Sequence, residues 1–143
     1  MNFTRSGSSK GFTLAEILIV IVVLAVMASL VMPRFTGQTD KAAAAEAIGI
    51  MGAIHRALLQ FNDENGAYPA NNLQNITDIT NTLGIDVSTV RFGWEFSTSG
   101  GTVTGTRKSG ETTIGTLTLS DAGQWNGTGK YAPGGEYWPH LPQ

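Results

Sequence analysis

The sequence predicts an α+β fold in which one long N-terminal helix packs on a small antiparallel sheet of three or four strands. Three observations predict it: an apolar run at residues 12–32, a helical stripe of apolar side chains further along, and alternating Thr- and Val-bearing segments near the C-terminus. The sheet alone carries too little apolar material to be stable. The striped helix therefore supplies its missing face.

The apolar run at residues 12–32 contains a single charge, Glu16. A helix rises about 1.5 Å per residue, so this run covers roughly 31 Å, close to the ~30 Å hydrocarbon core of a bilayer. Residues 1–11 carry two basic side chains and no acid, which keeps the N-terminus in the cytoplasm. We expect a single membrane pass, with everything after Met32 outside.

Glu16 distinguishes this run from an ordinary anchor. Acids inside a membrane are costly and are usually paired. The run contains no cation, and Arg34 lies about 27 Å further along a helix. Glu16 therefore either lies hydrated among the headgroups or finds a partner elsewhere. A cleaved secretory signal is disfavoured because the apolar run continues past the small residues at 28 and 29.

Residues 33–62 are expected to form a second, amphipathic half of the same helix. Pro33 opens this half, and a proline inside a helix costs about 3 kcal/mol because it removes one hydrogen bond and clashes with the preceding turn. The sequence predicts a helix broken at Pro33, although this proline could instead only mark the membrane exit. One helical face of this half carries the apolar stripe, which consists of Ala47, Met51, Ile54, Leu58 and Phe61.

Residues 63–143 are expected to form a globular head. Turn-forming residues at 62–69 end the long helix, and a short helix is predicted within residues 71–83. Three segments alternate in the manner of strands, at residues 89–96, 101–108 and 112–120. The tail at residues 131–140 has no periodicity and is expected to pack as an irregular loop over the sheet edge.

The segment Lys10-Gly11-Phe12-Thr13-Leu14-Ala15-Glu16 and the apolar run after it resemble the processing and methylation signature of type IV prepilins and type II secretion pseudopilins. The signature joins a basic leader, a Gly-Phe junction, a glutamate and about twenty apolar residues. It covers roughly residues 5–35, a quarter of the chain. The resemblance implies the pilin fold, a long helix laid on a small antiparallel sheet.

The resemblance also implies how the chain is processed. A prepilin peptidase would cut between Gly11 and Phe12, releasing residues 1–11 as a leader peptide, and Phe12 would be N-methylated. In similar filaments the new amine of Phe12 pairs with the glutamate of a neighbouring subunit, here Glu16, so these two residues would form the assembly site. Pairing matters because a buried charge without a partner is strongly destabilising.

The function implied is that of a structural subunit stored in the bacterial inner membrane, with its head outside the cytoplasm. An inner-membrane assembly platform would pack it into a periplasmic or extracellular filament with copies of itself. Residues 65–69 resemble major pseudopilins of type II secretion, which we slightly favour over the major pilin of a surface type IV pilus used for adhesion or motility. A distant alternative is a monomeric membrane-anchored binding domain.

No arrangement of residues indicates an enzyme. The two histidines lie 85 residues apart, Lys108 lacks the preceding glycine of a phosphate-binding loop, and no cysteine is present for a thiolate metal site. Removal of the leader would leave seven basic and eleven acidic side chains, which argues against nucleic acid as a partner. No cofactor is expected. Calcium is the one candidate metal, but the C-terminal end offers only Asp121 and Glu136 as acids.

Overall fold

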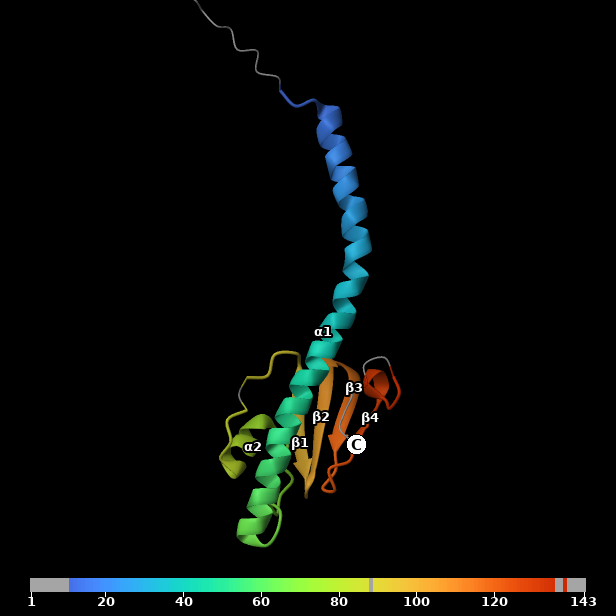
Figure 1. Ribbon diagram of the computed structural model, residues 1–143. Helices are drawn as coiled ribbons and strands as arrows, with labels where there is room; N and C mark the ends of the chain where they lie inside the picture. Colours follow the sequence, from blue (N-terminus) through green and yellow to red (C-terminus); the bar gives the residue numbers. More distant parts are fainter. Residues whose placement is uncertain (1–10, 88, 136–137, 139–143) are drawn as a thin grey trace, which may run out of the picture. The chain divides into compact units, whose positions relative to one another are not determined.

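The computed structural model describes residues 11–135, except residue 88, together with Trp138; at residues 31–36 it describes the backbone only. The predicted leader thus lies outside the described residues, apart from Gly11. The chain divides into two compact units, one ending at Thr36 and one beginning at Gly37. From here on, the name head refers to this second unit, which includes the section of α1 that begins at Gly37. Figure 1 shows both units in the colours of the sequence.

One long helix, α1 (Leu14–Asn65), contributes to both units. The helical backbone continues through Pro33, where the sequence predicts a break. A proline removes one hydrogen bond of the helix, and the remaining bonds on either side are sufficient to keep the backbone helical here. The predicted break at Pro33 is therefore wrong for this structure, in which α1 is continuous.

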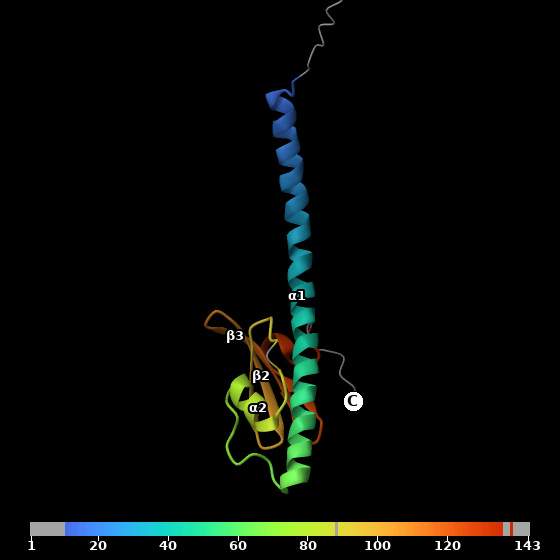
Figure 2. The same ribbon diagram turned by 90° about the vertical axis from the view of Figure 1, so that its left-hand side faces the viewer.

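Within the head, α1 buries the face that its sequence predicts. Ala47, Met51, Ile54 and Leu58 are fully buried, whereas Phe61 stays partly exposed near the end of the helix. The head section of α1 crosses one face of the sheet in both views (Figures 1 and 2). The apolar stripe is thus the helix side of the core, as expected for an amphipathic helix on a small sheet.

The sheet has four antiparallel strands in the order β1-β2-β3-β4. Their bounds are β1 (Trp94–Ser99), β2 (Thr102–Ser109), β3 (Thr112–Leu119) and β4 (Trp125–Gly127). Strand alternation places Phe96, Val103 and Leu117 in the core and leaves threonines on the opposite face. The prediction of three or four antiparallel strands is confirmed at four.

The first strand begins later than its sequence suggests, at Trp94 instead of residue 89. Gly93 adopts φ +70°, and a Cβ atom at this position would lie 2.7 Å from the carbonyl oxygen of Lys108. Only glycine fits such a left-handed position at this spacing. Residues 89–92 therefore form a loop, and β1 extends instead through Ser99.

The remaining elements are short. Helix α2 (Ile76–Leu83) lies within the predicted stretch and packs against β1, and the Asn75 side chain caps it by accepting a hydrogen bond from the backbone N–H of Asp78. A 3-10 helix, η1 (Gly129–Tyr131), lies against β3. Tyr131 heads the predicted irregular tail, yet it is fully buried.

Candidate functional site

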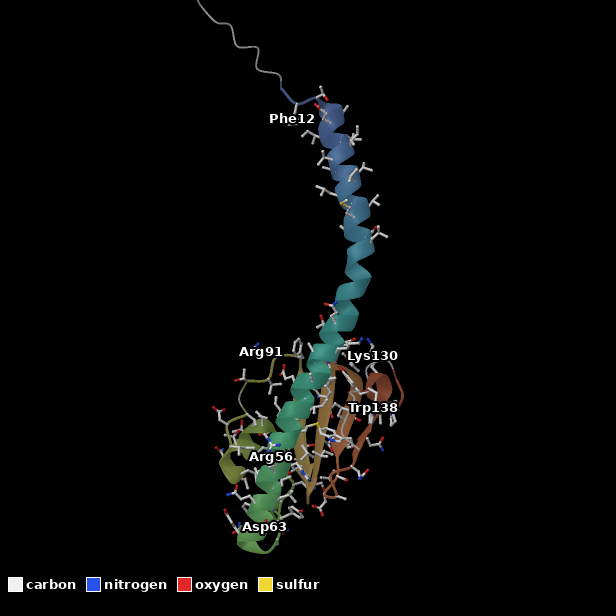
Figure 3. The ribbon with its side chains drawn as sticks, viewed as in Figure 1. Phe12, Arg56, Asp63, Arg91, Lys130 and Trp138 are labelled. Carbon is white, nitrogen blue, oxygen red and sulfur yellow. The ribbon has the colours of Figure 1, made fainter. Side chains whose placement is uncertain are left out.

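The predicted processing junction lies just before α1. Gly11 and Phe12 precede the helix, Phe12 is 84% exposed, and a Cβ atom at Gly11 would touch nothing. Figure 3 shows Phe12 at the start of the helix. Exposed, non-helical backbone is the preferred substrate of proteolysis. The structure thus leaves the peptide bond between the two residues accessible.

Glu16 is engaged at the start of the helix by a residue that the sequence analysis did not single out. Its Oε2 accepts hydrogen bonds from the backbone N–H of Thr13, at 2.9 Å, and from the Thr13 hydroxyl, at 3.0 Å. In return, the backbone N–H of Glu16 donates to Thr13 Oγ1 at 3.2 Å. This reciprocal pattern is a capping box, with Thr13 at the N-cap and Glu16 three residues later.

The capping box partly answers the question of how an acid is tolerated in this run. Two donors of Thr13 satisfy one carboxylate oxygen, and a negative charge is favourable in the first turn of a helix. Among the described residues, Oε1 of Glu16 has no partner. The sequence alone could have predicted this capping box, because a threonine followed three residues later by glutamate before an apolar run is its usual pattern.

The apolar surface that follows is uncovered. Large apolar side chains from Leu14 to Leu30 are 47–82% exposed, on all sides of the helix. A helix that is apolar all round is stable only inside lipid or against other apolar surfaces. This surface therefore requires a covering that the described part of the chain does not supply.

Among the described residues, the head section of α1, Gly37–Asn65, is the one helical stretch long and apolar enough to cross a membrane by length and composition, and Leu14–Leu30 is a shorter apolar stretch. A third of the apolar window in the head section is, however, already buried within the protein. It also carries several charges, among them Asp40, Lys41 and Glu46. Its apolar face belongs to the head, whereas the section that begins at Leu14 exposes its large apolar side chains.

Titratable side chains are few at two hollows that the described residues of the head form. Two hollows, of 460 and 340 Å³, have one titratable side chain each in their lining, Glu64 and Glu95. No group of three His, Cys, Asp or Glu side chains gathers among the described residues. Asp121 is engaged, since Oδ1 accepts a hydrogen bond from the Tyr68 hydroxyl. Calcium needs six to eight oxygens, so this donor set fits it poorly. Glu136 lies outside the described residues.

Comparison with known proteins identifies the N-terminal region. Residues 7–32 match the family model of the prokaryotic N-terminal methylation motif. The start of the chain thus matches a prokaryotic N-terminal methylation motif. Gly11, Phe12, Thr13 and Glu16 all lie within the matched residues.

Proteins named type II secretion system core protein G are similar over a longer stretch. The relative from Klebsiella michiganensis is 40% identical over 65 residues, covering 46% of this chain and 46% of the relative. The relative from Escherichia coli strain K12 is 41% identical over 63 residues, covering 44% and 43%. That from Pseudomonas aeruginosa is 42% identical over 61 residues, covering 43% of each. The match thus spans less than half the length of these relatives.

Proposed function

We propose that this protein is a structural subunit, similar to a major pseudopilin, that polymerises through its N-terminal helix into a filament of type II secretion. One observation carries the proposal: the methylation motif leads directly into a helix whose apolar side chains are exposed on all sides. Such a surface can be covered first by lipid and then by the same helix of other copies. The names of its relatives favour secretion over a surface pilus.

The proposed location follows from the same helix. Before assembly the subunit spans the bacterial inner membrane once, with its N-terminus in the cytoplasm and its head outside. Assembly moves it into a filament. Over these stages its proposed partners are the bilayer, the prepilin peptidase, an inner-membrane assembly platform and other copies of itself.

The open oxygen of Glu16 supports the proposed contact between subunits. Thr13 occupies Oε2, and Oε1 has no partner among the described residues. Cleavage after Gly11 creates an amine on Phe12, and Oε1 of a neighbouring copy can accept a hydrogen bond from it. A charge-assisted bond of this kind is stronger than a neutral one and fixes the register of the two helices.

Processing is tested by the mass of the mature chain. In a host that supplies a prepilin peptidase, the purified protein is expected to begin at Phe12 and to carry one added methyl group. A Gly11→Val variant serves as the control and should retain the leader. An intact Met1 end on the unaltered chain in that host would contradict the assignment of the junction.

Assembly is tested by producing the chain together with the components of a type II secretion system. Filaments that contain the protein are expected in sheared or sedimented fractions, labelled by antibody under the electron microscope. A chain that is processed but stays in the membrane fraction as a monomer would refute the filament role and favour an anchored binding domain.

A further inference from the structure

Asp40 is a buried carboxylate near the beginning of the head, and each of its oxygens faces a cation. Its side chain is 11% exposed. Oδ1 lies 2.5 Å from Nη1 of Arg107 on β2, and Oδ2 lies 3.3 Å from Nζ of Lys130 on η1. A buried charge that loses a partner is poorly compensated, so the buried Asp40 and Arg107 depend on each other and Asp40 also depends on Lys130.

Tyr131 completes this group. Its hydroxyl is a hydrogen-bond partner of Nη1 of Arg107, and the Nε–H of Arg107 points at the carbonyl oxygen of Phe92, 3.4 Å away. Burial raises the pKa of Tyr131, which keeps its hydroxyl protonated. We call Asp40, Arg107, Lys130 and Tyr131 the clamp. It joins three elements, α1, β2 and η1.

Close packing fixes the η1 side of the clamp. A Cβ atom at Gly115 of β3 would lie 2.5 Å from the carbonyl oxygen of Thr128 and 3.0 Å from the ring of Tyr131. Glycine is therefore needed for the backbone of η1 to lie directly on β3. Trp138 packs against the core further along the chain. The C-terminal segment, residues 128–135 with Trp138, is thus seated on the head and presents Lys130 to α1 (Figure 3).

Two further polar contacts hold α1 just beyond Asp40, and neither involves the C-terminal segment. The indole N–H of Trp94 donates to the carbonyl oxygen of Ala43 at 2.9 Å, in a buried position. The backbone N–H of Arg91 donates to Oε1 of Glu46 at 2.7 Å. Loss of the clamp would consequently free the turn around Asp40 and leave α1 attached from Ala43 onward.

We propose that the C-terminal segment latches the beginning of the head section of α1 through the clamp. With the clamp closed, the turn around Asp40 belongs to the head. With Asp40 released, this turn can unwind as far as Ala43 while the helix and sheet stay packed. The latch would set how much of α1 is held by the head, whether or not the chain assembles.

Hydrogen exchange of the full chain in detergent micelles, followed by mass spectrometry, tests the latch. Asp40→Asn keeps the shape of the side chain and removes its charge. Amides of residues 41–44 are expected to exchange at least about tenfold faster, because their helical partners are the carbonyls of residues 37–40. Amides of residues 51–58 should be unchanged. Lys130→Gln should act in the same direction and add nothing in the Asp40→Asn background.

Glu95→Gln is the matched control, because it breaks the exposed ion pair of Glu95 with Lys108, at 2.6 Å, outside the clamp. It should leave residues 41–44 protected. Unaltered exchange at these residues in Asp40→Asn would overturn the latch, and so would equal acceleration at residues 51–58, which indicates general destabilisation. If Asp40→Asn does not fold, Lys130→Gln decides alone, since the Lys130 side chain is 53% exposed.

Discussion

Glu16→Ala is expected to reduce incorporation into filaments by on the order of a hundredfold when the variant competes with the unaltered chain. The amine that cleavage creates on Phe12 of a neighbouring subunit would be left without its anionic partner inside an apolar helix bundle. The measurement is the ratio of variant to unaltered chain in purified filaments, by mass spectrometry of co-expressed subunits. Total membrane levels of the two chains provide the reference.

Two further variants separate the charge of Glu16 from its role in the capping box. Glu16→Gln keeps an oxygen that can accept from Thr13 but removes the charge, and it should be nearly as defective as Glu16→Ala. Thr13→Ala removes the cap and leaves the charge, and it should still assemble, since the loss of a cap costs only about 1 kcal/mol. Efficient assembly of Glu16→Gln would rule out the charge pairing.

Arg107→Leu is expected to lower the free energy of unfolding of the head by about 3 kcal/mol, because among the described residues it leaves the buried Asp40 with Lys130 as its one ion-pair partner. The hydroxyl of Tyr131 also loses its hydrogen bond. Denaturant unfolding followed by the fluorescence of Trp94 and the other tryptophans measures the change. Glu95→Gln, which removes an exposed pair, should change stability by less than about 1 kcal/mol.

A double-mutant cycle and the acid limb of the stability curve check the same pair. Arg107→Leu should lower the free energy of unfolding less in an Asp40→Leu background than in the unaltered chain, because no buried charge is then left without a partner. Equal losses in both backgrounds would contradict the ion pair.

Burial alone would raise the pKa of Asp40, but hydrogen bonds from Arg107 and Lys130 outweigh it and lower the pKa. The pair therefore stabilises the head above the unfolded pKa of about 3.9, and this contribution is lost as the pH falls through the lower folded value.

Features with a local pattern were predictable. The exposed apolar helix follows from composition, and the stripe from Ala47 to Leu58 follows from its spacing, since a helix repeats every 3.6 residues. The strands at β2 and β3 follow from alternation and from the glycines that separate them. The capping box is equally local, because Thr13 and Glu16 lie within one turn, although Glu16 was interpreted as a charge that is either hydrated or paired elsewhere.

Features that depend on distant parts of the chain were not predictable. The start of β1 depends on how closely Gly93 approaches Lys108, and the continuity of α1 through Pro33 depends on the balance of hydrogen bonds around one missing donor. Nothing near Tyr131 in the sequence shows that it is buried. Its position is set by the glycines that let η1 lie on β3.

The sequence by itself determined the N-terminal apolar helix of this protein and its acid at position 16, and it predicts the junction at Gly11 and Phe12, because all three are encoded by neighbouring residues. Only the tertiary structure decided how the sheet and the C-terminal segment hold the section of α1 that belongs to the head. Asp40 meets Arg107 and Lys130 across 67 and 90 residues of sequence. Such a contact leaves no periodic pattern in the sequence, because Asp40 and Arg107 become buried only when helix, sheet and C-terminal segment pack together.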